Sequence, residues 1–123
     1  MAKVVAVIGA SNNRAKFGNK AVRVYLSQGY TVVPINPHEE RVEGLRAYPS
    51  VLDVPGPVDM ASFYVPPEIG ERVIEDVARK HIAEVWLNPG ADSDELVAKA
   101  KSLNIKLIVA CSIVAVGLNP NAL

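Results

Sequence analysis

Short runs of β-branched residues alternate with segments of helical periodicity along almost the whole chain. Val4–Ile8, Thr31–Ile35 and Met60–Val65 have the continuous apolar character of strands that are buried on both faces. Glu84–Leu87 and Lys106–Ala110 repeat this pattern, and helix-period segments separate most successive strands. Such alternation predicts a parallel sheet with right-handed crossovers. We therefore expect an α/β fold, a Rossmann-like doubly wound parallel sheet of about five main strands with helices on both faces.

Helix boundaries are marked by residues with strong positional preferences. Gly29 follows a helix-period segment and is typical of a C-terminal cap. Pro66-Pro67 suits the first turn of a second helix. Asp92 is expected to begin a third helix, because Glu95 follows it in the spacing of a capping box. The uncharged stretch Leu107–Leu118 overruns the last strand and carries no helix-start signal.

Length, charge and cysteine content bound the class of protein. The 123 residues fit a single domain over residues 1–123, and half of them are apolar. The net formal charge is zero, which argues against a dedicated nucleic-acid-binding or membrane-binding protein. A single cysteine rules out an intrachain disulfide, and the sequence shows neither a signal-like segment nor a membrane-spanning run. We therefore expect a cytoplasmic protein without nucleic-acid or membrane partners.

The loop after the first strand has the composition of a phosphate-binding turn. Gly9 permits a tight turn, and the small residues Ala10 and Ser11 leave backbone N–H groups open to phosphate oxygens. Arg14 and Lys16 add positive charge beside the N-terminus of the following helix. The loop lacks two of the three glycines of the dinucleotide-binding fingerprint, and it is not a P-loop. A plain polar turn is the alternative to a site for a nucleotide-like phosphate ligand.

Neither a catalytic constellation nor a metal site stands out. Ser11 lacks the glycine-flanked setting of a hydrolase nucleophile, and His38 and His81 have no recognisable acid partners. Two isolated histidines and one cysteine do not supply the several ligands that a metal needs. Cys111 is expected to be a small buried hydrophobe. The sequence therefore favours a binding protein over an enzyme.

Several short motifs, in their order and spacing, resemble one protein family. They are Gly9-Ala10-Ser11, Lys16–Asn19, Gly29–Pro37, Gly44, Tyr48–Pro55, Val58-Asp59, Pro66–Glu68 and Trp86-Leu87. Together they resemble the small bacterial and archaeal CoA-binding-domain proteins, a family similar to the CoA-binding domain of the succinyl-CoA synthetase α subunit. The resemblance covers about residues 3–112.

The resemblance implies that the chain binds coenzyme A, or an acyl-CoA, at the carboxyl ends of the parallel strands without catalysis of its own. It places the pyrophosphate on the first loop, adenosine near Asn36 and Pro37, and the 3′-phosphate near Arg41. Together, the loop composition and the resemblance give the candidate ligand-binding residues Gly9, Ala10, Ser11, Arg14, Lys16, Gly18, Asn36, Pro37, Arg41, Val65, Pro66 and Gly90. The synthetase works as a ligase only with further domains.

This sequence departs from the family pattern near two strand ends. Tyr64 stands where members often carry arginine, and Ala110-Cys111-Ser112 stands where many carry Asp-Arg-Cys. The apolar tail replaces a charged one. These changes concern functions that depend on the C-terminal end, and they leave the phosphate loop untouched.

Two other functions stay open. An NAD(P)-binding domain would use an acid after the second strand to hold a ribose diol, and Glu39 or Glu40 lies close to that position. A protein–protein interaction module with an idle ligand site would explain the apolar stretch Leu107–Leu118 if that stretch were exposed. The same stretch is longer than one strand needs, so we expect part of it to lie in the interface of a homodimer.

Overall fold

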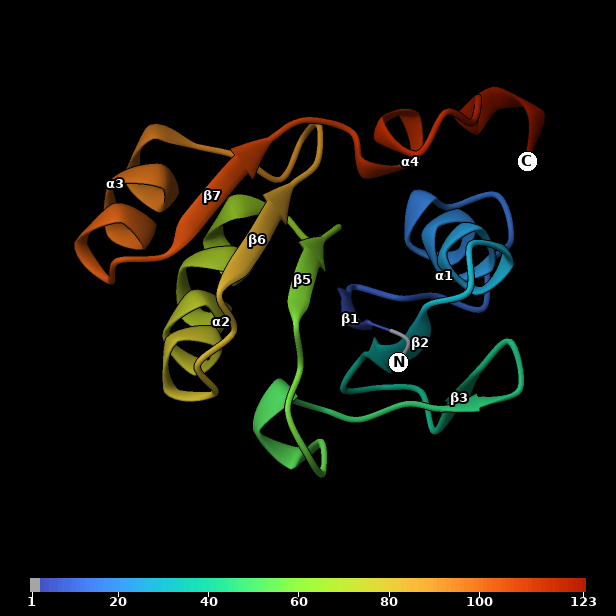
Figure 1. The fold of residues 1–123 in the computed structure, drawn as a ribbon, viewed down its shortest axis with the longest axis horizontal. Coiled ribbons are helices and arrows are strands. Elements are labelled where there is room, and N and C mark those ends of the chain that lie inside the picture. The colour runs from blue at the N-terminus through green and yellow to red at the C-terminus, as the bar shows by residue number, and fades with distance from the viewer. Residues whose placement is uncertain (1–2) are drawn as a thin grey trace.

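All five strands of the main sheet run parallel, in the order β2-β1-β5-β6-β7 (Figure 1). The computed structural model describes residues 3–123. The strands of this sheet are β1 (Val4–Ile8), β2 (Thr31–Ile35), β5 (Met60–Phe63), β6 (Glu84–Leu87) and β7 (Lys106–Val109). The chain moves outward from β1 to β2 and then returns to β5 on the other side of β1. The strand order therefore reverses between β1 and β5, which is where such sheets bind ligands.

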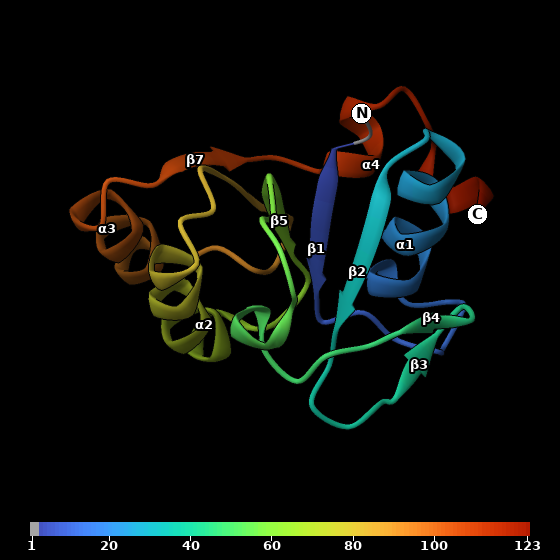
Figure 2. The same ribbon diagram turned by 60° about the horizontal axis from the view of Figure 1, so that its bottom comes forward.

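Helices cover both faces of this sheet (Figure 2). The four α-helices described are α1 (Phe17–Ser27), α2 (Pro67–Arg79), α3 (Asp94–Ser102) and α4 (Ser112–Ala115). Val5 and Val7 of β1 pack in the cluster that contains α1 and Ile113 of α4. Ala6 and Ile8 point to the other face and pack with side chains of α2 and α3. The predicted Rossmann-like α/β fold with five parallel strands is confirmed.

Gly and Pro residues mark residues 38–58 as irregular in the sequence, which allows a short strand near Arg46–Tyr48 and a helical turn near Ser50–Asp53. The structure has short elements at both places and adds a hairpin. A two-stranded hairpin joins β3 (Arg41–Val42) to β4 (Leu45–Arg46), and a 3-10 turn, η1, spans Val51–Asp53. Glu43 and Gly44 form the hairpin turn with positive φ angles of 49° and 78°, as a tight two-residue turn requires. A second 3-10 turn, η2, is at Pro120–Ala122.

The start of α3 differs from the prediction by one residue, and α4 was not predicted. The N-cap of α3 is Ser93, one residue after the predicted Asp92, and its Oγ accepts the Leu96 N–H at 3.0 Å. Serine and aspartate are both favoured at the N-cap, so the shift of one residue keeps a capped helix start. The helix α4 forms within the stretch that carried no start signal. Its first N–H, that of Ser112, donates to the buried Asn88 side chain at 2.9 Å, a tertiary contact that no local pattern reveals.

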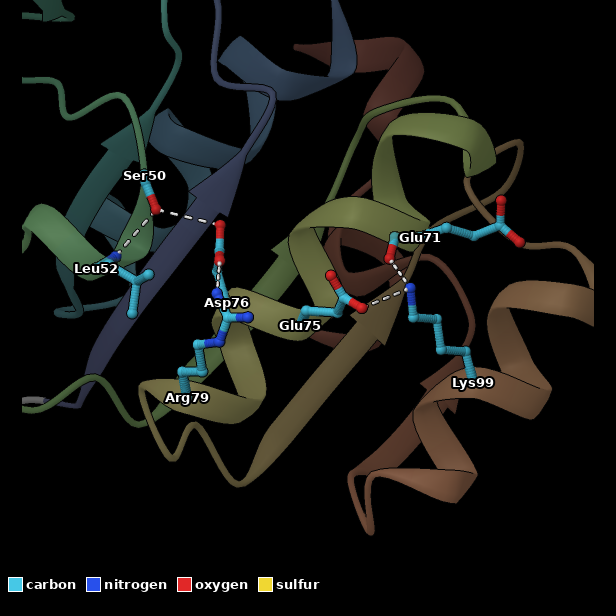
Figure 3. A network of polar contacts seen from close by, with 7 residues as sticks. All are labelled: Ser50, Leu52, Glu71, Glu75, Asp76, Arg79 and Lys99. Atoms are coloured by element: carbon cyan, nitrogen blue, oxygen red, sulfur yellow. Dashed lines mark hydrogen bonds and ion pairs between the residues drawn. The ribbon is translucent and has the colours of Figure 1, made fainter.

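Polar contacts join the elements on the α2 and α3 side of the molecule (Figure 3). Ser50, which caps η1, lies 3.4 Å from the Asp76 carboxylate of α2. Lys99 of α3 donates to the Glu71 carbonyl at 2.7 Å and pairs with the Glu75 carboxylate at 3.2 Å. Exposed pairs contribute little each, so these contacts fix orientation while the apolar cluster supplies most of the stability.

No helix within residues 3–123 has the length and apolar character needed to cross a bilayer.

The homodimer stays a prediction, and the structure indicates a surface for it. Val109 on the edge strand β7 and Val114 on α4 are 53% and 56% exposed, although both lie in the apolar stretch. We expect light scattering to report the mass of two chains, and the double change V109K/V114K to reduce it to one, because charge opposes burial of this surface. A single-chain mass for the native protein at high concentration would contradict the prediction.

Candidate functional site

An open cleft of about 610 Å³ lies beyond the carboxyl ends of β1, β5 and β6, at the reversal in strand order. Its wall is built from the β1–α1 loop and the first turn of α1, from the end of β2, and from the segments that follow β5 and β6. The lining residues are Gly9, Ser11, Ala15, Lys16, Phe17, Gly18, Asn36, Tyr64, Val65, Pro66, Pro89, Gly90 and Ala91. Among the residues that the structure describes, this lining contains no carboxylate and no imidazole.

The first turn of α1 borders the cleft without a side-chain cap. Lys16 is the N-cap residue, and its side chain accepts no hydrogen bond from the helix N–H groups. The first turn of this helix contains no acidic residue. The positive end of an eleven-residue helix therefore lies at the cleft, and the N-cap Lys16 adds a positive charge to the cleft lining. Both features favour an anion here.

Two glycines let the loop and the strand ends approach one another. A Cβ on Gly9 would lie 2.8 Å from the Tyr64 carbonyl oxygen, and Gly9 has a φ of 89°. A Cβ on Gly18 would collide with the Gly9 carbonyl oxygen. Gly9 was expected to permit a tight turn close to a ligand, and its positive φ fits such a turn. The absence of a side chain at Gly9 also lets the end of β5 approach, and the absence of one at Gly18 lets the loop pack against α1.

A set of amide side chains fixes the course of the loop. Asn19 is fully buried, and its Nδ2 donates to the Ser11 carbonyl at 2.8 Å and to the Glu43 carboxylate at 3.1 Å. Arg23 donates from Nε to Asn19 Oδ1 at 2.7 Å. Asn36 donates from Nδ2 to the Ala10 carbonyl at 2.8 Å. These bonds clamp the loop between α1, the end of β2 and the β3–β4 hairpin.

A second hollow of about 640 Å³ adjoins the cleft at Asn36. It is lined by Asn36, Pro37, His38, Glu39, Glu40, Arg41, Arg46, Ala47 and Pro49. The Glu39 carboxylate in this hollow accepts a hydrogen bond from Asn12 Nδ2 at 2.9 Å. Glu39 is one of the acids that an NAD(P) site would use for a ribose diol, and here it binds the loop.

The structure brings most of the sequence-predicted residues together. Eight line the main cleft, namely Gly9, Ser11, Lys16, Gly18, Asn36, Val65, Pro66 and Gly90. Pro37 and Arg41 line the second hollow with Asn36. Ala10 is fully buried, so its side chain packs in the core. Arg14 belongs to neither lining and forms an ion pair with Glu43 at 3.7 Å.

Sequence reasoning did not assign several lining residues to the site, and Tyr64 and Phe17 are the most prominent of them. Phe17 is half exposed at the mouth of the cleft. Tyr64 follows β5 immediately, and that position at a strand end was the available signal. Its hydroxyl lies 2.6 Å from Ser112 Oγ, and burial raises the pKa of the Tyr64 phenol. Cys111 is partly exposed, contrary to the buried position expected for it.

Within residues 3–123, no group of three or more His, Cys, Asp and Glu side chains is placed to hold a metal ion.

Several known proteins with similar sequences are CoA ligases. The chain is 33% identical over 116 residues to acetate–CoA ligase (ADP-forming) I of Archaeoglobus fulgidus, an alignment that covers 86% of this chain and 17% of the ligase. It is 39% identical over 84 residues to the α subunit of acetate–CoA ligase (ADP-forming) II of Pyrococcus furiosus, covering 66% of this chain and 18% of that subunit. The chain thus spans less than a fifth of the length of these relatives.

Among solved structures, a conserved hypothetical protein of Pyrococcus furiosus has a TM-score of 0.84 and 33% identity, covering 94% of this chain and 99% of that one. Acetyl-coenzyme A synthetase 1 of Ca. Korarchaeum cryptofilum matches with a TM-score of 0.77 and 31% identity, covering 88% of this chain and 26% of the synthetase. The family model described as CoA binding domain matches residues 3–117. On that match and these relatives, the chain belongs to the CoA binding domain family.

Proposed function

We propose that this chain binds coenzyme A or an acyl-CoA in the main cleft, with the pyrophosphate at the N-terminus of α1, and does so without catalysis of its own. The observation that carries the proposal is the uncapped first turn of α1 beside Lys16, in a cleft whose described lining has no carboxylate. Family membership supports CoA as the nucleotide. The lack of carboxylate and imidazole groups among the described lining residues supports binding over catalysis.

The charges around the second hollow support a place for the adenosine 3′-phosphate. The hollow is lined by Arg41 and Arg46, which can bind a phosphate, and by the acids Glu39 and Glu40. Asn12 hydrogen-bonds the Glu39 carboxylate and the Arg41 carbonyl. Asn36 joins the two hollows, so one extended ligand can occupy both. CoA and NAD need different charges in this region. The 3′-phosphate of CoA needs a base, whereas the ribose diol of NAD needs a free acid.

Isothermal titration calorimetry with CoA, dephospho-CoA and NAD on ligand-free protein tests this function. We expect CoA to bind more tightly than dephospho-CoA, since only CoA carries the 3′-phosphate, and NAD to bind most weakly. Tighter binding of NAD than of CoA would replace the proposal with the dinucleotide alternative. No binding of any of the three at millimolar concentration would favour the interaction module.

Two substitutions separate the contributions of the phosphates. Lys16→Ala should weaken CoA and dephospho-CoA alike, by about 1–3 kcal/mol, because it removes a charge-assisted contact at the pyrophosphate. Arg41→Ala should weaken CoA by a similar amount and leave dephospho-CoA unchanged. Lys101→Ala, which removes the same charge from α3 on the opposite face, is the matched control. Equal losses in all three variants would show a general charge effect and contradict the assignment.

A further inference from the structure

A small cavity adjoins the main cleft behind its two aromatic side chains. Its volume is about 60 Å³, and it is lined by Phe17, Tyr64, Asn88, Pro89 and Cys111. Three of these residues, Phe17, Tyr64 and Pro89, also line the main cleft. The cavity is thus a side pocket of the cleft, between the first turn of α1 and the segments that follow β5, β6 and β7.

The polar atoms in the walls of this side pocket are already bonded to the protein. Asn88 is buried, and its Nδ2 donates to Ser62 Oγ at 2.8 Å and to the Phe63 carbonyl at 2.9 Å. Asn88 Oδ1 accepts the Ser112 N–H, and the Tyr64 hydroxyl bonds Ser112 Oγ. What remains toward the cavity is aromatic and proline surface and the Cys111 thiol, which is a weak donor. The described walls of the pocket therefore offer no partner for a charge.

We propose that this side pocket receives the acyl group of a CoA thioester and selects acyl groups that are short and uncharged. The inference rests on the proposed function and adds the class of ligand. A cavity of 60 Å³ equals the volume of about two water molecules at ~30 Å³ each, which suits an acetyl or propionyl group. A dicarboxylic acyl group would bring a carboxylate into a site without a counter-charge among its described walls, at a large desolvation cost.

The layout of the cleft lets the ligand reach this pocket. The pyrophosphate position at the first turn of α1 and the β6 end at Pro89 and Gly90 belong to one continuous lining. Tyr64 and Pro89 belong to this lining as well. Both residues form walls of the side pocket.

A series of ligands tests the selectivity by calorimetry. Adenosine 3′,5′-bisphosphate lacks the pantetheine arm and the second phosphate of the pyrophosphate, and it reports on the adenosine part of the site. We expect acetyl-CoA to bind at least as tightly as CoA. The affinities of succinyl-CoA and octanoyl-CoA should each be lower than that of acetyl-CoA by at least about tenfold. Equal affinities for all thioesters, with CoA itself bound, would overturn this inference alone. No binding of CoA or the bisphosphate would overturn the proposed function as well.

Filling the pocket gives an independent check. Cys111→Met adds volume inside the cavity, so acetyl-CoA should lose at least about tenfold in affinity while adenosine 3′,5′-bisphosphate keeps its own. Leu103→Met, at an exposed position outside the pocket and outside the apolar stretch Leu107–Leu118, is the matched control and should change neither. Unchanged acetyl-CoA binding by a folded Cys111→Met protein would contradict the pocket.

The native protein provides a second measurement if Cys111→Met does not fold. Cys111 is the only cysteine in the sequence, so its alkylation by iodoacetamide can be followed by intact mass. Saturating acetyl-CoA should slow this alkylation at least about fivefold more than saturating adenosine 3′,5′-bisphosphate, because only the thioester reaches the thiol. Equal protection by the two ligands would place the acyl group elsewhere.

Discussion

Replacing Gly18 with alanine is expected to abolish CoA binding and to lower the free energy of unfolding by about 1–3 kcal/mol. The new methyl group would collide with the Gly9 carbonyl oxygen, a backbone atom that cannot rotate away. The loop would then move off the first turn of α1 and away from the phosphate position. Alanine is the better helix former, so any loss of stability measures the collision. Denaturant unfolding and calorimetry with CoA measure the two effects.

Gly29→Ala is the matched control at the other end of α1. Gly29 has a φ of 86°, and a Cβ added there would meet no atom of another described segment within 4 Å. The substitution should cost about 1–2 kcal/mol of backbone strain and leave CoA affinity unchanged. Full CoA affinity in a folded Gly18→Ala protein would show that the loop tolerates displacement, and would contradict the role given to this close approach.

Asn19→Leu is expected to reduce the free energy of unfolding by about 2–4 kcal/mol, because the fully buried Asn19 loses its hydrogen bonds to partly buried partners while the number of side-chain heavy atoms is kept. The Ser11 carbonyl, the Glu43 carboxylate and Arg23 each lose a hydrogen bond. CoA affinity should fall about tenfold or more, since Asn19 holds the loop at Ser11. Thermal unfolding and calorimetry report these changes.

Asn12→Ala provides the comparison for that experiment. Asn12 also joins the loop to the segment after β2, through Glu39 and the Arg41 carbonyl, but these hydrogen bonds are exposed. Removing them should cost no more than about 1 kcal/mol. If Asn19→Leu lowers the free energy of unfolding and the CoA affinity no more than Asn12→Ala does, the buried amide does not order the loop.

The main sheet was predictable because each of its strands carries its own signal. Val4–Ile8 and Thr31–Ile35 are apolar runs that need burial on both faces, and the structure contains strands with these bounds. The hairpin turn at Glu43-Gly44 was missed because Glu43 takes a positive φ that glutamate rarely adopts. The helix α4 was missed because a tertiary bond from Asn88 supplies its start.

The site was predictable where it depends on strand ends and unpredictable where it depends on contacts across the sheet. Gly9, Asn36, Val65 and Gly90 follow strands, and parallel topology brings such positions to one edge. The close approach of the Tyr64 carbonyl to Gly9 was not predicted, because it joins two strand ends that lie far apart in the sequence. The side pocket was hidden from the sequence, since its walls come from four separate segments.

The way α4 packs determines how easily its segment can open locally. A helix of four residues has no stability by itself, so its order depends on the Ser112–Asn88 bond and on the burial of Ile113. We therefore expect local opening of this segment to cost less free energy than global unfolding, and that smaller free energy to govern amide hydrogen exchange there. Because Tyr64 of the cleft bonds Ser112, each opening also frees a wall of the cleft. Ligand occupancy and the exchange rates of residues 112–116 are therefore thermodynamically linked.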